Sequence, residues 1–322
     1  MSACSRKARA DNIARSDDVA KALAGLTTTT EECAENIDHI PGAPCSSRKM
    51  LEAITSFVIE KTAAADAESD AEIVRAAEDA LKCTSESCVI MHPTFQQYVI
   101  TKHLMPEKTL QLELAQRFKA PGPRDSMALL SNYNIDGTLQ RWARVFPEFY
   151  PCAFAMMDFD RNGDYFGSTS MSSIFEGRVD TNLGPGFRQV RRKASCFGCV
   201  VNTDTSSGVG KHWVAVFVDG RPTKFNVPWT IEYFNSAGNP PPRPMVIWMA
   251  RTRANLESYR QGPVATIPVT DMDHQESQTE CGLYALFYIR RRLEEVPYTF
   301  FYEQRIPDAA MTTFRQHVFR AA

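Results

Sequence analysis

The sequence lacks any apolar run long enough to cross a bilayer, and residues 1–10 lack the apolar segment of a secretory signal. It also lacks an excess of either charge, because 36 lysines and arginines face 38 aspartates and glutamates, for a net charge of -2. This balance gives no sign of a partner recognised by charge alone, such as nucleic acid or an anionic membrane. We therefore expect a soluble, intracellular protein with no membrane insertion and no clear nucleic-acid site.

Cysteine is too sparse and too scattered for a disulfide framework. The nine cysteines are odd in number and range from Cys4 to Cys281, unlike the dense spacing of small secreted domains. We therefore expect reduced thiols. Cys196 and Cys199 form a lone CxxC without a second pair at zinc-site spacing, so we interpret them as strand residues, with a redox pair as the alternative. We predict no metal and no cofactor.

Two other motifs fall short of a binding site. Residues 158–164 imitate the first half of a calcium loop, but Thr169 stands at the twelfth position, where an acidic ligand is required. A polar hairpin turn is the better interpretation. A basic run just before the CxxC, formed by Arg188, Arg191, Arg192 and Lys193, is interpreted as a solvated loop, with an acidic or nucleic-acid partner as the alternative.

The first third of the chain has helical periodicity. Ser47 can cap a first helix, and further helices are predicted at 71–82, at 94–104 and after Pro106. Two prolines and a glycine within 119–124 should end this helical part. We predict a weakly ordered extension at residues 1–30, a helical arm domain at 31–119 and a core domain at 120–322.

The core domain alternates strands and helices. Strands are predicted at 196–204, 212–219, 224–234 and 264–270, and helices at 138–146, 245–259, 281–294 and 307–319. This mixture predicts an α+β domain with a central mixed, mainly antiparallel sheet.

Cys281 stands at the start of the predicted helix 281–294, which is apolar nearly all round and should be buried. A thiol at that place meets the positive end of the helix dipole and unpaired backbone N–H groups, which favour the thiolate. Residues 275–280 supply amide side chains for a developing oxyanion. Cys281 is therefore a candidate nucleophile, with a small buried core cysteine as the alternative.

A cysteine nucleophile needs an imidazole and a group that orients it. His212 begins a predicted strand, and Asn235 follows the next one. The chain order His, Asn, Cys differs from that of papain-like enzymes, yet convergent triads allow it. Glu232 is the runner-up for the orienting group, but its side chain and that of Asn235 should project to opposite faces of the strand.

The sequence around these candidates resembles a known family. The likeness spans roughly residue 30 to the C-terminus, and the motifs that carry it are SESCVIMHP (85–93), FKAPGPR (118–124), NIDGTLQRWA (134–143), FGCVVNTD (197–204), GKHWVAVFVD (210–219), IEYFNSAGN (231–239) and HQESQTECG (274–282). They resemble the polyprotein-processing cysteine protease of African swine fever virus and its relatives in large DNA viruses. That family shares the fold of adenovirus proteinase and the SUMO proteases.

The resemblance implies a cysteine endopeptidase that cleaves viral structural polyproteins after Gly-Gly during virion maturation. Its location would be the host cytoplasm, in viral factories, and the virion. The family pattern favours Asn235 over Glu232 as the orienting group. The family spacing Gln-x5-Cys selects Gln275 for the oxyanion hole, and Gln278 is the rival.

The resemblance also implies substrate-binding residues. The segment with Asn132 and Asn134 should line the substrate cleft, although Asn134 or Asp136 could instead cap a helix. Trp213 either walls a narrow cleft or packs as a core indole, and Gln278 is a further candidate for substrate binding. The helical arm domain either contacts substrate or packs on the core.

Other functions remain open at this level. An isopeptidase that removes ubiquitin-like modifiers would use the same triad, because those modifiers also end in Gly-Gly. An acyltransferase or an inactive binding module on the same fold are further alternatives, although the complete set of His, Asn, Gln and Cys argues against the inactive module.

Overall fold

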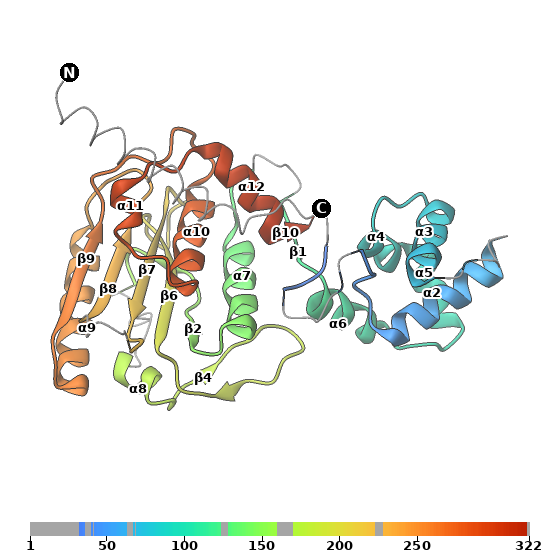
Figure 1. Cartoon of the computed structure of the whole chain (residues 1–322), viewed down its shortest axis with the longest axis horizontal. Coiled ribbons are helices and arrows are strands. Elements are labelled where there is room, and N and C mark those ends of the chain that lie inside the picture. Colours follow the sequence, from blue (N-terminus) through green and yellow to red (C-terminus); the bar gives the residue numbers. More distant parts are fainter. Residues whose placement is uncertain are drawn as a thin grey trace, which may run out of the picture. The chain divides into compact units, whose positions relative to one another are not determined.

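The computed structural model describes residues 32–35, 40, 42–62, 67, 69–123, 128–159, 170–222 and 228–320. They form two compact units (Figure 1). The helical unit contains the described residues up to Gly122, together with Gly184–Phe187 and residues 318–320; the sheet unit contains Pro123–Leu183 and Arg188–His317. The predicted extension at residues 1–30 lies outside the described residues, as does all but the first two residues of the predicted polar turn.

Within the described residues, the helical unit contains α2 (Arg48–Lys61), α3 (Asp70–Leu81), α4 (Glu86–Met91), α5 (Pro93–Thr101) and α6 (Glu107–Arg117). Ser47 caps α2 as predicted, since its side chain accepts the Met50 N–H at 3.3 Å. The sequence did not reveal α4, because six residues are too few to show a helical period. The strand β1 (Ala120–Pro121) pairs in parallel with β10 (Phe319–Arg320).

One apolar core holds the helices of this unit together. Phe57 of α2 packs edge-on against Phe95 of α5, with ring centroids 5.5 Å apart. Two disulfides lie in the same unit, Cys33–Cys45 and Cys83–Cys88. The expectation of reduced cysteines is therefore wrong for these four residues. Their pairing depends on Cα atoms that the fold brings within 5.1 and 5.6 Å, which sequence spacing alone does not reveal.

The sheet unit is built on a six-stranded mixed sheet in the order β2-β6-β7-β8-β9, with β3 beside β6. Its two antiparallel pairs, β6 with β7 and β7 with β8, form the centre, and the outer pairs are parallel. The strands are β2 (Phe149–Pro151), β3 (Ala155–Met156), β6 (Cys196–Asn202), β7 (Trp213–Asp219), β8 (Trp229–Phe234) and β9 (Val264–Val269). A separate antiparallel pair joins β4 (Asp180–Thr181) to β5 (Val190–Arg191).

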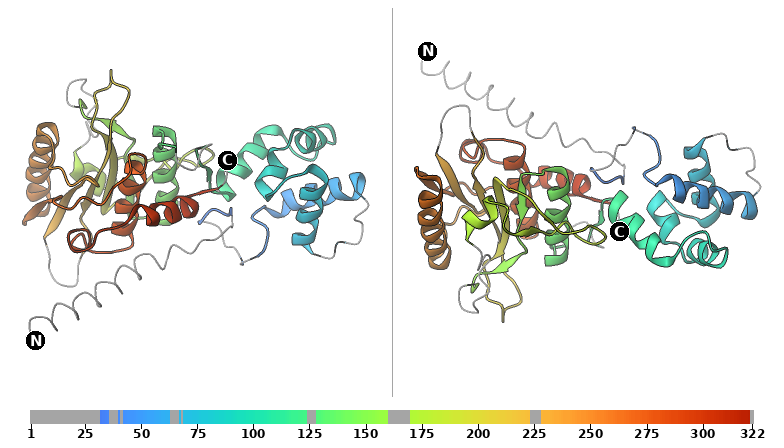
Figure 2. Two further views of the ribbon diagram at one scale, coloured as in Figure 1. Left: turned by 90° about the horizontal axis from the view of Figure 1, so that it is seen from above. Right: turned by 90° about the horizontal axis from the view of Figure 1, so that it is seen from below.

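Helices cover both faces of this sheet (Figure 2). They are α7 (Asn132–Val145), α8 (Met171–Phe175), α9 (Arg243–Arg260), α10 (Cys281–Leu293), α11 (Phe300–Glu303) and α12 (Asp308–Val318). Side chains of a strand alternate in direction, so Phe197 and Cys199 pack toward α9 while Gly198 lies against Ile289 of α10. A Cβ at Gly198 would come within 3.2 Å of Ile289, which explains how closely α10 approaches the sheet.

Several motifs serve this architecture. Cys196 and Cys199 are buried strand residues of β6, as predicted. Arg191 pairs with Asp180 at 3.0 Å, and Arg192 donates to the Phe149 carbonyl oxygen at 3.3 Å, so the basic run is partly tied to the sheet unit rather than simply solvated. None of the helices in the described part of the chain is both long enough and apolar enough to cross a membrane.

Candidate active site

Cys281 is the first residue of α10 and is only 3% exposed. The helix behind it is buried along its whole length, which holds the thiol in place. Gly282 is required at the second position, because an added Cβ would meet Leu130 at 3.1 Å and Trp213 at 3.3 Å. The start of α10 is therefore packed tightly between the segment before α7 and the start of β7.

The environment of the thiol differs from the expectation drawn from its helix position. Burial raises the pKa of Cys281, and this effect exceeds the opposing effect of backbone N–H groups of Trp213, Gly282 and Cys281 itself. These N–H groups nevertheless point at the sulfur, as a helix start predicts. The resting side chain is thus a neutral thiol that needs a base to become a nucleophile.

His212 lies directly before β7 and is held by Asn235, which directly follows β8. The Nε2 atom of His212 lies 2.8 Å from Oδ1 of Asn235. The same Oδ1 accepts the Ala237 N–H at 3.0 Å, and Nδ2 of Asn235 donates to the Asn239 carbonyl oxygen at 3.2 Å. These bonds fix the orientation of the amide, so Nε2 of His212 carries the proton and Nδ1 presents a free lone pair.

The His212 imidazole favours its neutral form, and its backbone neighbour meets the thiol. Burial lowers the pKa of His212, and the hydrogen bond to Asn235 opposes this by raising it. The backbone N–H that meets the Cys281 sulfur belongs to Trp213, the residue that follows His212. The structure thus joins His212 to Asn235 directly, and it joins the start of β7 to the start of α10 through the Trp213 N–H and the Cys281 sulfur.

Glu232 has a different partner. Its carboxylate is fully buried and accepts hydrogen bonds from the Tyr288 hydroxyl at 2.7 Å and from Nε of Arg292 at 2.8 Å, both on α10. It lies three residues before Asn235, and the alternation along β8 sends the two side chains to opposite faces. The carboxylate therefore holds α10 against the sheet.

The two glutamines differ in how firmly they are held. Oε1 of Gln275 accepts from the Ser236 hydroxyl at 2.9 Å, and its Nε2 donates to the Ser277 carbonyl oxygen at 2.7 Å. One N–H of its amide thus remains for another acceptor. The side chain of Gln278 is exposed. Gln275 is adjacent in space to the Asn235–Ser236 segment, because its backbone N–H donates to the Ser236 carbonyl oxygen at 3.2 Å.

A pocket of about 380 Å³ opens at Cys281. Trp213 and Asn132 are among the residues that line it, while Asn134 and Gln278 are not. The other candidates, His212, Asn235 and Gln275, are also outside its lining. The indole of Trp213 is 9% exposed and donates to the Leu130 carbonyl oxygen at 3.3 Å, so this side chain is both a packed indole and a pocket wall. Other lining residues are Leu129, Leu130, Ser131, Phe154, Met156, Asn202 and residues 208–211.

The helix beside this pocket begins earlier than predicted. α7 starts at Asn132 rather than Thr138, because Ser131 caps it and the side chain of Asn134 closes a reciprocal capping box. Oδ1 of Asn134 accepts from the Ser131 backbone N–H at 3.0 Å and from its hydroxyl at 2.7 Å. Asp136 does not cap; it accepts the Phe154 N–H at 2.7 Å.

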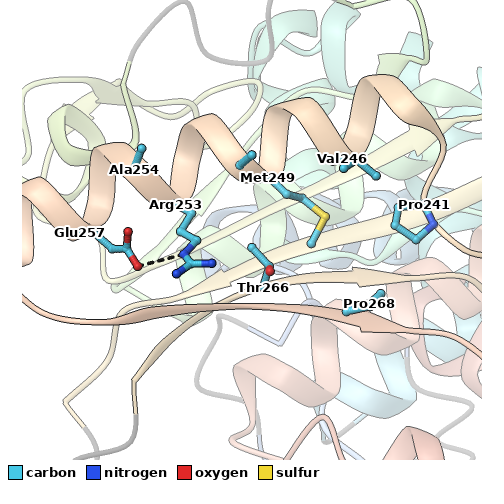
Figure 3. Close-up of a pocket in the computed structure, with 9 residues that line it drawn as sticks. Pro241, Val246, Met249, Arg253, Ala254, Glu257, Thr266 and Pro268 are labelled. Atoms are coloured by element: carbon cyan, nitrogen blue, oxygen red, sulfur yellow. Dashed lines mark hydrogen bonds and ion pairs between the residues drawn. The ribbon is translucent and has the colours of Figure 1, made fainter.

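A larger pocket of about 480 Å³ lies between α9 and β9 (Figure 3). Its walls are apolar apart from Thr266 and an ion pair in which Arg253 donates to Glu257 at 2.9 Å. Neither a cysteine nor a histidine lines it. The smaller pocket is therefore the candidate active site, because Cys281, the candidate nucleophile, lines it.

Two residues that shape the candidate site, Asn202 and Ser236, were not predicted from the sequence. Asn202, at the end of β6, lines the pocket, and its Oδ1 accepts the N–H groups of Asp204 at 2.9 Å and Lys211 at 3.1 Å. It thereby shapes the loop that leads to His212. Ser236 orients Gln275. Asn202 could have been noticed as the polar last residue of an otherwise apolar strand. Ser236 could have been noticed because it directly follows Asn235.

Comparisons with known proteins bear on this arrangement. Residues 189–321 match the Ulp1 protease family, C-terminal catalytic domain. The chain is 45% identical over 300 residues to a SUMO-1 cysteine protease of African swine fever virus (isolate Pig/Kenya/KEN-50/1950), with 93% of this chain and 99% of the relative covered. The chain belongs to the Ulp1 protease family. This Ulp1-family protein is a cysteine protease, as its sequence predicted.

A solved structure supports the family assignment across both units. The Ulp1-family chain superimposes on the crystal structure of an African swine fever virus protease with a TM-score of 0.77 and 44% identity. The superposition covers 93% of this chain and 99% of that one. The predicted α+β fold with a mixed sheet and an N-terminal helical region is thus confirmed. A second relative, the cysteine protease of the virus isolate Tick/Malawi/Lil 20-1/1983, is 44% identical with the same coverage.

Proposed function

We propose that this cysteine protease cleaves viral structural polyproteins after Gly-Gly during virion maturation, in the cytoplasm of the infected cell and in the particle. Cys281 is the nucleophile, His212 is the general base and acid, and Asn235 orients the imidazole. The observation that carries this proposal is the His212–Asn235 hydrogen bond of 2.8 Å, which leaves Nδ1 unprotonated on the residue that directly precedes Trp213, whose peptide N–H meets the Cys281 sulfur. A base and a thiol in this relation are what thiol proteolysis requires.

The reaction proceeds in two balanced halves. Nδ1 of His212 takes the thiol proton as the sulfur forms a bond to the carbonyl carbon of the substrate, and the carbonyl oxygen becomes an oxyanion. The resulting imidazolium then gives that proton to the leaving amine as the C–N bond breaks. A water molecule, deprotonated by the same nitrogen, attacks the thioester and releases the carboxylic acid product and the free thiol.

The oxyanion would be stabilised by the backbone N–H of Cys281 and by the remaining amide N–H of Gln275. The side chain of Gln275 is held at both ends, by Ser236 and Ser277, which favours it over the exposed Gln278. A donor held in place before the reaction needs no reorganisation as charge develops. Loss of one such donor typically lowers kcat about 10²- to 10³-fold.

The pocket supports the preference for glycine. Trp213 is a rigid wall beside Cys281, and Leu130 packs against both the Trp213 indole and Gly282. Glycine residues of a substrate have no Cβ and can approach such a wall closely. Asn132, in the first turn of α7, is positioned to hydrogen-bond the substrate backbone.

The leading alternative is an isopeptidase that acts on ubiquitin-like modifiers. One relative bears the name SUMO-1 cysteine protease, and modifiers of this kind also end in Gly-Gly. The chemistry at Cys281 would be the same in both functions, so only the substrate distinguishes them. An acyltransferase would use the same acyl-enzyme but would exclude water from it.

The test compares the wild-type protein with its Cys281→Ala and Cys152→Ala variants. Both cysteines are free thiols of the sheet unit, which makes Cys152 a matched control. We expect hydrolysis of Gly-Gly-X polyprotein peptides by the wild type and by Cys152→Ala, and none by Cys281→Ala, which should remain folded. Equal hydrolysis by all three proteins would remove Cys281 from the mechanism.

The same assay separates the alternatives when the peptides are compared with a ubiquitin-like substrate that ends in Gly-Gly. Efficient cleavage of the modifier alone would favour the isopeptidase. Transfer of an acyl group to an added amine without hydrolysis would favour the transferase.

A further inference from the structure

The loop of residues 274–280 carries Gln275 and leads directly into Cys281. Within the loop, the Ser277 carbonyl oxygen accepts from Gln275 at 2.7 Å, and the Ser277 hydroxyl donates to Glu280. Contacts from one side of the loop come from Ser236, as described above. The contacts from the other side come from residues 305–308, at the start of α12, and these have no part in the chemistry proposed so far.

Asp308 makes the central contact. One carboxylate oxygen, Oδ2, accepts the Ser277 backbone N–H at 2.8 Å. The other, Oδ1, lies 2.8 Å from the hydroxyl of Tyr284, one turn into α10. A single carboxylate thus joins the loop that carries Gln275 to the helix that begins at Cys281. Hydrogen bonds to an ionised group are shorter and stronger than those between neutral groups.

A second contact supports the same loop. His274 is 1% exposed, and its Nδ1 accepts the Ile306 N–H at 3.2 Å. Burial lowers the pKa of His274 to about 4, so the ring is a neutral acceptor at ordinary pH. The His274 carbonyl oxygen also lies 3.2 Å from the Tyr284 hydroxyl. The residue before Gln275 is therefore anchored to the same segment as Ser277.

We propose that Asp308 is a positioning residue of the oxyanion hole: it fixes the Gln275 loop relative to Cys281 by bonding Ser277 and Tyr284 together. This inference rests on the proposed role of Gln275. Asp308 does not touch the substrate or the reacting atoms. Its effect is on where the Gln275 amide and the Cys281 N–H stand when the oxyanion forms.

The chemistry of the two contacts predicts a graded series of variants. Both groups that face Asp308 are donors, so Asp308→Ala removes both bonds. Asp308→Asn keeps one acceptor oxygen and should retain the bond to Ser277. The Tyr284 hydroxyl then has the Ile306 carbonyl oxygen, at 2.8 Å, as another acceptor. The asparagine variant should therefore lie between the wild type and the alanine variant.

The experiment measures three quantities for the wild type, Asp308→Ala, Asp308→Asn and Gln275→Ala. The first is the steady-state hydrolysis of a Gly-Gly-X peptide, given by kcat and KM. The second is the rate of alkylation of Cys281 by iodoacetamide, and the third is the affinity for a Gly-Gly peptide aldehyde. Alkylation forms no oxyanion, whereas the hemithioacetal of the aldehyde places an oxygen in the oxyanion hole. A role confined to the oxyanion hole must lower kcat and the affinity for the aldehyde, and it must leave KM and the alkylation rate nearly unchanged.

For Asp308→Ala we expect a fall in kcat of about 10-fold or more, bounded by the roughly 10²- to 10³-fold cost of losing a donor outright. KM and the alkylation rate should stay within about twofold, and aldehyde affinity should fall with kcat. The control is Glu276→Ala. It breaks an exposed ion pair, 2.6 Å between Arg305 and Glu276, which also joins the loop of residues 274–280 to residues 305–308. Exposed pairs contribute little, so this variant should behave as the wild type.

Three outcomes would overturn the inference. An alkylation rate that falls as far as kcat would show a general structural role, and an unchanged kcat in Asp308→Ala would show no role. If Asp308→Ala fails to fold, Asp308→Asn decides by the same comparison. Normal hydrolysis by Gln275→Ala would instead reject the oxyanion assignment itself. An impaired Gln275→Ala beside a normal Asp308→Ala would reject only the positioning role.

Discussion

At the scale of single residues, the protonation states of Cys281 and His212 decide how the site operates. Burial raises the pKa of the thiol and lowers that of the imidazole, so both groups are neutral at rest. A preformed thiolate–imidazolium pair is therefore disfavoured in this structure. In the proposed mechanism the imidazole therefore acts as a general base, and its neutral form is the active one.

This assignment gives the pH dependence a definite sign. The neutral imidazole is present above the pKa of His212, and burial places that pKa below its ordinary value of about 6.5. The acid limb of kcat/KM should thus lie below that pH. The bond to Asn235 raises the pKa, so Asn235→Ala should move the limb to still lower pH while kcat falls roughly 10²-fold through lost orientation.

The pH profile of kcat/KM for the wild type, Asn235→Ala and Tyr233→Phe checks this prediction. The Tyr233 hydroxyl contacts Nδ2 of Asn235 at 3.3 Å but leaves the bond between Asn235 and His212 intact. This variant should therefore keep the wild-type limb. A limb that moves to higher pH in Asn235→Ala would contradict the assignment of the imidazole as the base.

The sequence indicated the chemical residues better than their surroundings. Cys281, His212 and Asn235 stand at predicted element ends, where alternation and helix period fix their direction. The expected sign of the Cys281 pKa shift was wrong, because burial outweighs the backbone N–H groups and only the fold supplies that burial. The contact of Asp308 with Ser277 could not be predicted from the sequence either, since the two residues lie 31 positions apart.

At the scale of elements, α10 is held against the sheet by a buried ion pair. Arg292 donates to Glu232 at 2.8 Å and 2.9 Å and to Asp219 at 3.0 Å. The exposed fractions of the Glu232 and Arg292 side chains are 0% and 7%. A pair this deeply buried need not exceed a hydrophobic substitute in stability, but the removal of one partner leaves a charge without compensation.

We expect Glu232→Ala to lower the free energy of unfolding by about 3–5 kcal/mol, because Arg292 then keeps only Asp219 as a buried counter-charge. Urea denaturation followed by circular dichroism measures the change. The matched control is Glu257→Ala, which breaks the partly exposed Arg253–Glu257 pair and should change the stability far less, because exposed pairs contribute little. The kcat of the folded fraction of Glu232→Ala should stay near that of the wild type. A fall in kcat as large as that of Asn235→Ala would instead indicate a catalytic role for Glu232.

The boundaries of elements were predicted well where apolar periodicity marks them. They were predicted poorly where a capping residue sets the start of a helix. The strands β6 to β9 and the helices α9, α10 and α12 lie within a few residues of their predicted ranges. α7 begins six residues before the predicted start, at Asn132, because the capping box of Ser131 and Asn134 outweighs the weak apolar period of that turn. The start of α7 was predicted from the apolar period alone, without the hydrogen bonds that cap a helix.

At the scale of the whole molecule, residues distant in sequence converge in the sheet unit, while the helical unit has its own means of stabilisation. Cys33–Cys45 closes a separation of 12 residues just before α2, and Cys83–Cys88 closes one of 5. The proposed nucleophile, Cys281, is a free thiol of the sheet unit. The two units therefore differ in the redox state of their cysteines.

The last prediction concerns the helical unit. Cross-linking restricts the unfolded chain more for longer loops, so we expect Cys33→Ser/Cys45→Ser to destabilise the unit by about 3 kcal/mol and Cys83→Ser/Cys88→Ser by about 2 kcal/mol. Hydrogen exchange of α2 amides in the full chain measures this, with α10 amides as the internal reference. Dithiothreitol should reproduce the loss of protection in the wild type while Cys281 remains alkylatable. Unchanged α2 protection in the first double variant would mean that the apolar core around Phe57 and Phe95 holds the unit without the cross-link.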